Sequence, residues 1–258
     1  MRTFILAISL LVMGLLPSLA PSQNAFEDGE WFRFRIHYGL INAGYATLGV
    51  EATTLQNKAV YHIKGYGTTT GLSRFFFKVE DHYDSYVDRS DNKPYRFVRK
   101  IDEGGHTKDK VIDFDHNLRK AYVNNRKHNT LETFDTRYNT HDMVSAFYYL
   151  RNAIDTDQLK VGDESELNMF FDEENFGFKL RFLGRDTINT KFGKVSCLKF
   201  RPLVMAGRVF KEKESLTIWV SDDQNKIPLR IKADLAVGSL KADLDAFKGL
   251  KHPFEIIY

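Results

Sequence analysis

The sequence contains little cysteine, little proline and no excess of charge of either sign: 258 residues include one Cys and six Pro, and the net charge is +3. A single Cys cannot form an intramolecular disulfide or a cysteine-based zinc finger. A near-neutral chain lacks the basic bias of nucleic-acid-binding proteins, so nucleic acid is not an expected partner. No phosphate-cradling or dinucleotide-binding motif occurs, and no cofactor is expected.

The N-terminus predicts a secretory signal peptide that covers residues 1–22. Arg2 gives a positively charged start, and the apolar run Phe4–Leu16 follows. As a helix this run would extend only about 20 Å, which is short for a bilayer. Ala20 and Ser22 are small residues typical of a cleavage site, and we expect cleavage after Ser22. We therefore predict export to the periplasm or the cell envelope, and an uncleaved anchor is the alternative.

The rest of the chain, residues 23–258, predicts a single β-rich domain. Apolar and polar side chains alternate with a period of two, as in Trp31–Tyr38, and polar turns separate the runs. No later segment is long and apolar enough to span a membrane. We predict a mainly β fold with a strongly curved antiparallel sheet, like a half-barrel or a sandwich. The other expected strands are 45–51, 59–66, 75–87, 95–101, 110–114, 120–123, 164–171, 178–182, 195–200, 216–220 and 228–233.

One segment carries a helical period instead. Thr140 and Asp142 offer capping oxygens, and Met143, Phe147 and Leu150 follow at helical spacing. We predict one central amphipathic helix over residues 142–153 that packs on the sheet. It marks a seam near 135–160 within the domain, because no linker-like composition separates two independent units.

Few residues suggest catalysis. Glu80, His82 and Asp84 would share one face of a strand, where they could bind a divalent metal in an envelope enzyme. The alternative is an ordinary solvated face, since no second His lies nearby in the sequence. No nucleophile motif is present, and Cys197 in an apolar strand is better explained as a buried thiol. We therefore predict that the protein is not an enzyme.

The aromatic surplus is the feature that points to a function. With 21 Phe and 12 Tyr, segments such as 75–77 and 170–171 place aromatic rings on both faces of a predicted strand. Such strands must be covered on both sides, by protein or by an apolar ligand. Core packing is one explanation, and a binding site for an apolar or amphipathic, lipid-like ligand is the other. The candidate ligand-binding residues are Phe75, Phe77, Phe147, Phe171 and Trp219.

A glycan-binding module of the cell envelope is the second functional hypothesis. It would use exposed aromatic rings as stacking platforms and requires a row of them on an open face. The residues that would form this row are Trp31, Tyr38, Tyr45, Tyr61 and Tyr66.

Three sequence blocks resemble an exported bacterial family, domain of unknown function 3108. The first block opens with Gly-Glu and ends in a Tyr-Gly turn, the second is the predicted helix with its flanks, and the third surrounds a Trp-x-Ser-Asp sequence. This resemblance implies export and a mostly antiparallel β fold, and it brings no catalytic residues. Because the matched residues suit turns and core anchors, they favour a scaffold. They are Gly29, Glu30, Tyr38, Gly39, Gly44, Thr140–Asp142, Tyr149–Arg151, Trp219, Ser221, Asp222, Pro228, Gly238 and Ser239.

Overall fold

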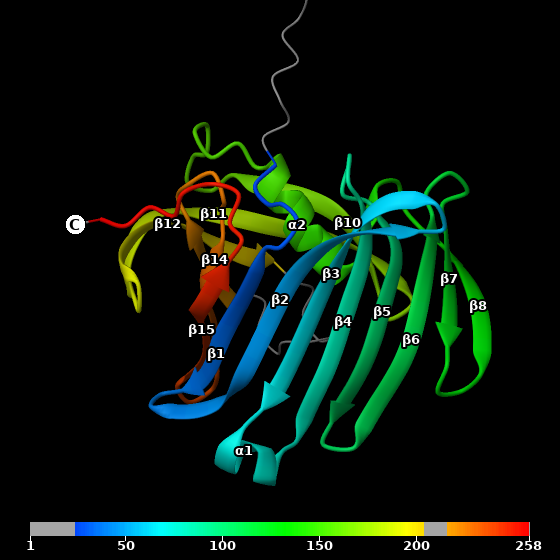
Figure 1. Ribbon diagram of the computed structural model, residues 1–258, viewed down its shortest axis with the longest axis horizontal. Helices are drawn as coiled ribbons and strands as arrows, with labels where there is room; N and C mark the ends of the chain where they lie inside the picture. The colour runs from blue at the N-terminus through cyan, green and yellow to red at the C-terminus, as the bar shows by residue number, and fades with distance from the viewer. Residues whose placement is uncertain (1–23, 204–215, 258) are drawn as a thin grey trace, which may run out of the picture.

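The computed structural model describes residues 24–203 and 216–257, so the predicted signal peptide lies outside the described residues. Within these ranges the chain forms one sheet of fifteen strands and two helices (Figure 1). The strands are β1 Trp31–Tyr38, β2 Ile41–Leu55, β3 Lys58–Thr69, β4 Val79–Asp88, β5 Pro94–Glu103, β6 His106–Asp115, β7 Lys120–Asn125, β8 Thr130–Asp135, β9 Thr140–His141, β10 Glu164–Phe171, β11 Glu174–Thr190, β12 Gly193–Leu203, β13 Leu216–Ser221, β14 Pro228–Asp234 and β15 Ser239–Lys248. The helices are α1 Gly71–Phe76 and α2 Met143–Ala153.

The sheet consists of two meanders joined at β1. Its order is β8-β7-β6-β5-β4-β3-β2-β1-β15-β14-β13-β12-β11-β10-β9, so β1 pairs with both β2 and β15. All neighbours are antiparallel except β9 and β10. Short polar turns let most strands pair with the strand before them, and the β1–β15 and β9–β10 pairs are the exceptions. The predicted mainly β, curved antiparallel fold is confirmed.

The sheet curves until its two ends approach each other without pairing. β1–β8 form one wall, and β10–β12 cross behind α2 at the upper end in Figure 1. Side chains bridge the gap near the edge: the Arg137 backbone N–H donates to Asn175 Oδ1 at 3.1 Å, and Asn175 Nδ2 donates to the Asp135 carbonyl at 2.7 Å. The result is an open, barrel-like shell.

The predicted helix is confirmed as α2, with Asp142 as its N-cap. Asp142 Oδ1 accepts from the backbone N–H groups of Val144 and Ser145, both at 2.8 Å, and Ser145 Oγ accepts from the Asp142 N–H. This reciprocal capping fixes the start of the helix. Among the described residues no helix is long and apolar enough to cross a membrane.

The helix fills the space between the two halves of the sheet. Val144 and Tyr148 belong to the apolar cluster of the N-terminal half, with partners such as Ile63. Ala146 and Leu150 pack instead with residues of β10–β12. Because both flanks of α2 are covered, it is part of the core at one end of the shell.

The strand predicted over residues 75–87 is wrong in its first part. Residues 71–76 form α1, and β4 begins only at Val79. The pairing of Thr68 with Glu80 closes β3 and β4 into a hairpin, so the residues between them have no strand partner. They coil instead into a helical turn, in which the Phe77 N–H donates to the Ser73 carbonyl at 2.9 Å. Hairpin register thus overrides the strand propensity of three consecutive Phe residues.

The doubly apolar strand predicted at residues 170–171 is covered by protein at Phe170 and only half-buried at Phe171. Phe170 is fully buried, and its ring lies 6.1 Å from that of Phe114 and 5.9 Å from that of Phe134. The neighbouring Phe171 faces the guanidinium of Arg99 at 4.6 Å. Other side chains of the protein therefore cover the side of the strand that carries Phe170, which supports core packing for this residue.

Cys197 is buried, as predicted, and burial raises the pKa of its thiol to about 12. Because the thiolate is the reactive form, we expect the native protein to react negligibly with a disulfide reagent such as dithionitrobenzoate. One thiol per chain should become reactive on unfolding in urea. Fast labelling of the folded protein, timed by absorbance, would contradict this burial.

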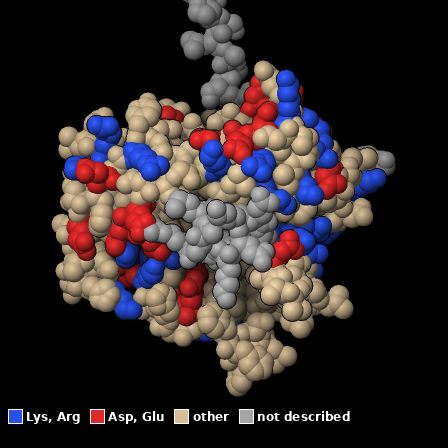
Figure 2. All heavy atoms as spheres, turned by 180° about the vertical axis from the view of Figure 1, so that it is seen from behind, with Lys and Arg blue, Asp and Glu red and all other residues tan. Residues whose placement is uncertain are grey.

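The outer surface mixes charges of both signs. On the side of the molecule shown in Figure 2, Lys and Arg are interspersed with Asp and Glu. Many of these side chains form exposed ion pairs, such as those of Arg185 with Asp222 and Arg181 with Glu164. This mixing agrees with the small net charge of the sequence.

Candidate functional site

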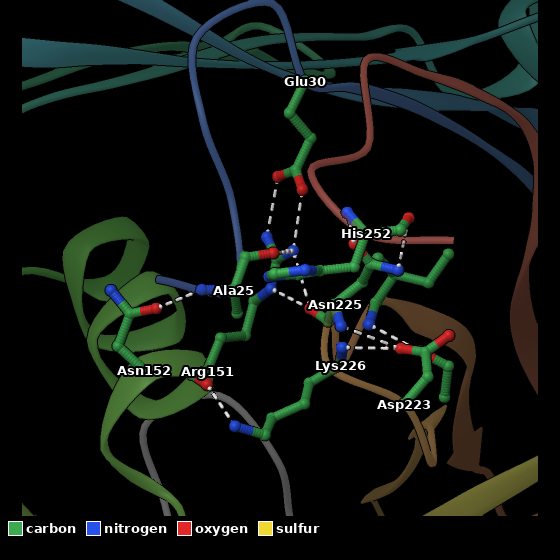
Figure 3. A network of polar contacts seen from close by, with 10 residues as sticks. Ala25, Glu30, Arg151, Asn152, Asp223, Asn225, Lys226 and His252 are labelled. Carbon is green, nitrogen blue, oxygen red and sulfur yellow. Dashed lines mark hydrogen bonds and ion pairs between the residues drawn. The ribbon is translucent and has the colours of Figure 1, made fainter. Parts of the chain in front are cut away.

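A fully buried ion pair joins α2 to the start of the sheet (Figure 3). Arg151 Nη1 and Nη2 donate to Glu30 Oε1 and Oε2, each at 2.7 Å, and both side chains are almost completely inaccessible. Such parallel bonding matches the planar guanidinium to the carboxylate and satisfies both charges. The pair therefore fixes the end of α2 relative to β1.

Arg151 also forms hydrogen bonds with chain segments that are far apart in the sequence. Arg151 Nη2 also donates to the carbonyls of Ala25 at 3.2 Å and Asn225 at 2.8 Å. Lys226 Nζ donates in turn to the Arg151 carbonyl, and Asn225 Oδ1 accepts from the His252 N–H. The N-terminal segment, α2, the β13–β14 turn and the C-terminal segment thus meet at one buried joint. Its lack of exposure makes it a structural element rather than a reaction centre.

A second buried polar group lies at the other end of α2. Ser85 Oγ donates to Asp142 Oδ2 at 2.6 Å, and burial raises the pKa of the Asp142 carboxyl to about 6. The ring of His141 is completely buried beside Tyr149, and burial lowers its pKa to about 4. Both groups are shielded from solvent, so their perturbed pKa values affect stability rather than a reaction.

The accessible candidate site lies on the concave face of β4–β6. Alternation on β5 places Arg99 on the same face as Phe97, which packs in the core cluster below α2. The Arg99 guanidinium lies 4.6 Å from the Phe171 ring and 5.8 Å from the Tyr83 ring. It also donates to Asp172 Oδ1 at 2.5 Å. We call Tyr83, Arg99, Lys108, Lys110, Phe171, Asp172 and Glu173 the mouth cluster.

The β10–β11 turn supplies the acids of the mouth cluster. Asp172 and Glu173 have positive φ angles, 46° and 68°, which form a tight turn between the two strands. This turn directs both carboxylates towards β6, where Lys108 Nζ bonds Asp172 at 3.0 Å and Lys110 Nζ bonds Glu173. The ion pairs hold the two halves of the sheet together across the opening, and the acids remain about one-third exposed.

Electrostatics indicate a poorly solvated surface around the mouth cluster. Burial raises the pKa of the Tyr83 hydroxyl. The pKa of Asp81 on the same face is also raised, mainly by burial and secondly by the neighbouring Glu103 carboxylate. Both shifts favour the neutral form, as expected where apolar groups displace water. An aromatic wall beside a fixed guanidinium can accept the apolar and the polar part of one ligand.

The structure does not bring the five sequence-predicted ligand-binding residues together. Phe171 alone belongs to the mouth cluster. Phe147 packs against Tyr148 on α2 at 5.1 Å, and Trp219 Nε1 on β13 donates to Asp186. Phe75 and Phe77 lie at α1, 86% and 54% exposed. A ligand-binding role for these residues stays a prediction.

Sequence reasoning missed the charged members of the mouth cluster. Arg99 stands between Phe97 and Ile101 in an alternating strand, which would have placed it on the apolar face. The signal available in the sequence was a charged residue at a strand position where the alternation predicts an apolar one. Its partner Asp172 lies 73 residues away, so no local pattern could connect the two.

The Glu80, His82 and Asp84 side chains share the outer face of β4, as expected. Glu80 lies 3.3 Å from Lys78, and Asp84 lies 3.7 Å from His62. Among the described residues no group of three or more His, Cys, Asp or Glu side chains could hold a metal ion. The ring of His82 lies 4.8 Å from that of Tyr66 on the same face.

The tyrosines of the glycan hypothesis do not form an exposed row. Tyr61 packs on the core cluster, and Tyr45 and Tyr66 are half-buried. Tyr38 is 39% exposed and its hydroxyl donates to a backbone carbonyl.

The described residues also form two hollows of about 250 and 490 Å³. Charged and polar side chains make up most of the lining of both hollows.

The chain is similar to one protein family and to two solved structures. A family model described as "Protein of unknown function (DUF3108)" matches residues 33–245. A crystal structure of a beta-barrel-like protein of domain of unknown function DUF1849 from Brucella abortus is 11% identical, with a TM-score of 0.56, and the match covers 86% of this chain and 98% of that one. A proposed exported protein with a YmcC-like fold from Bacteroides fragilis is 12% identical over 86% and 97% of the two chains, with a TM-score of 0.34. The search of curated proteins gives no match.

Proposed function

The chain belongs to the DUF3108 family, and we propose that it is a non-enzymatic exported protein that binds an apolar or amphipathic ligand on the concave face of its sheet. Export rests on the signal peptide that the first 22 residues predict. The barrel-like fold supplies a scaffold for binding without itself specifying a ligand.

The contact between Phe171 and Arg99 is the observation that carries this proposal. The ring and the guanidinium lie 4.6 Å apart on a partly accessible concave surface. An amphipathic ligand would place its chain against Phe171 and Tyr83 and its polar group beside Arg99. The ion pairs of Asp172 hold Arg99 in place beforehand, which reduces the entropy lost on binding.

The position of α2 supports the same site. The helix contacts β3, β4, β9 and β10 at one end of the shell, and its two buried polar anchors keep it there. The helix α2 thus fills the concave face at that end of the shell. The mouth cluster lies on the part of the concave face that α2 does not fill. A rigid wall of this kind favours a preformed binding surface.

Binding is tested with the purified protein and a fluorescent fatty acid as the probe. We expect Phe171→Ala to weaken binding about tenfold, which corresponds to about 1.4 kcal/mol, because the aromatic wall is lost. The matched control is Tyr66→Ala, which removes a ring beside His82 on the outer face and should leave the affinity unchanged. Organic extraction followed by mass spectrometry should also identify a co-purified amphiphile.

Two results would contradict the proposal. One is the absence of both a co-purified amphiphile and probe binding. The other is equal loss of affinity in Phe171→Ala and Tyr66→Ala, which would indicate adsorption without a defined site.

A further inference from the structure

One end of the molecule exposes large apolar side chains that no part of the described chain covers. On α1, Leu72 is 78% exposed, Phe75 86% and Phe76 81%, and none of the helix's residues is buried. Isolated apolar residues are common on protein surfaces, but three on one short helix form a patch. The helix lies in the connection between β3 and β4, at the lower end of the shell in Figure 1, and these side chains are open to solvent there.

Two neighbouring hairpins extend the patch. The β1–β2 turn exposes Leu40 and Ile41, and the β14–β15 turn exposes Leu235 and Val237. In Figure 1 both hairpins lie at the same end of the shell as α1. We call α1 and these two turns, residues 38–42, 71–77 and 234–240, the apolar end.

Hydrogen bonds make the apolar end one continuous unit. The Tyr38 hydroxyl donates to the Val237 carbonyl at 3.0 Å, which joins the two hairpins. The Thr70 N–H donates to the Ala43 carbonyl at 3.0 Å, which joins the start of α1 to β2. The exposed side chains therefore keep a fixed arrangement relative to one another.

Charge is scarce at the apolar end and is balanced between the two signs. It contains one cation, Arg74, with Lys78 directly after α1, and one acid, Asp234, which is paired with Lys232 at 2.7 Å. On the side shown in Figure 2, the lower end of the molecule carries fewer charged side chains than the body above it. Arg74 lies 3.7 Å from Glu80, and Lys78 lies 3.3 Å from Glu80 and 2.9 Å from Asp102, so the nearby cations are paired. Projecting apolar side chains with polar and paired groups behind them suit a membrane interface.

We propose that the apolar end docks on the surface of a lipid bilayer and inserts Leu72, Phe75 and Phe76 between the headgroups. A bilayer fits better than a protein partner because the exposed apolar side chains come from three separate chain turns at one end of the shell and the few charges there are already paired. Fluid lipid can surround each tip separately, and Arg74 and Lys78 then lie beside the phosphates. This inference rests on the exposed end alone and does not depend on the proposed ligand site.

The test is flotation of the purified protein with vesicles of phosphatidylethanolamine and phosphatidylglycerol. We expect the Leu72→Ser/Phe76→Ser variant to lose at least about tenfold in partition coefficient, since it loses most of the inserted apolar area. The matched control is Leu118→Ser, which removes an equally exposed leucine, 65% accessible, from the β6–β7 turn. Circular dichroism should show that both variants are folded, because the replaced side chains are exposed.

A second variant gives a signal on binding rather than a loss. Phe76→Trp should show a blue-shifted tryptophan emission when vesicles are added, and the shift should persist at high salt because insertion is apolar. Three outcomes would overturn the proposal: no flotation of the unmodified protein, equal flotation of the Leu72→Ser/Phe76→Ser variant, or a change of that variant's sedimentation without vesicles. The last would identify the apolar end as a contact between copies of the chain.

Discussion

Replacing Glu30 with alanine is expected to lower the free energy of unfolding by about 3–5 kcal/mol, because it leaves the Arg151 charge buried without its partner. Both side chains are essentially inaccessible, so water cannot replace the lost carboxylate. The loss is measured by urea denaturation, followed by tryptophan fluorescence. It would be among the largest effects of any single substitution in this chain.

The control is Glu51→Ala, which removes an exposed ion pair with Lys64. Screening by solvent should make this change small compared with that of Glu30→Ala. Replacing both buried partners, as Glu30→Leu/Arg151→Met, should recover part of the stability, since the uncompensated charge disappears while the carbonyls of Ala25 and Asn225 still lose a donor. A Glu30→Ala protein as stable as Glu51→Ala would contradict the structural role of the pair.

The second large effect concerns pH at the start of α2. Burial lowers the pKa of His141 from 6.5 to about 4. Between these two pH values the His141 ring is therefore protonated in the unfolded chain and neutral in the folded protein. This difference costs about 3 kcal/mol of stability on acidification. Burial also lowers the pKa of the neighbouring His116, which acts in the same direction.

Asp142 opposes this loss. Its pKa is raised from 3.8 to about 6, so the folded protein binds a proton that the unfolded chain does not. The resulting stabilisation is complete below the unfolded value and is lost as the pH rises through 6; it amounts to about 3 kcal/mol. Between about pH 4 and pH 6 the contributions of His141 and Asp142 nearly cancel.

Two variants should separate the contributions. Asp142→Asn keeps a capping side chain but removes the compensation, so its stability should fall more steeply than that of the unmodified protein as the pH is lowered. His141→Phe should show the opposite change, with stability that increases on acidification. Urea denaturation across this pH range measures both slopes, and parallel profiles for all three proteins would show that neither buried group titrates as stated.

Local patterns in the sequence predicted α2 and twelve of the fifteen strands of the described residues, whereas β8, β9 and β15 were not predicted. The period of two in residues 164–171 predicts β10 with its observed limits, because alternation along a strand depends only on neighbouring residues. The capping oxygen of Asp142 and the helical spacing after it define α2 for the same reason.

The candidate site could be predicted only in part. Phe171 was selected from its aromatic neighbours, but its partner Arg99 comes from a strand in the other half of the sheet. Phe75 and Phe77 looked like strand residues because the sequence does not show that β3 pairs with β4 and leaves them in the connection. Register between strands depends on the whole sheet, which no local window contains.

The sequence by itself determined that this is a near-neutral, mainly β chain with one capped helix, because composition, period and caps act over a few residues. Only the tertiary structure decided that Glu30 meets Arg151 across 121 residues, that α2 plugs one end of an open shell and that three apolar tips share the other. These arrangements depend on how far a fifteen-stranded sheet curves before its edges meet. Sheet twist and core packing set that curvature jointly, so it is a property of the assembled fold.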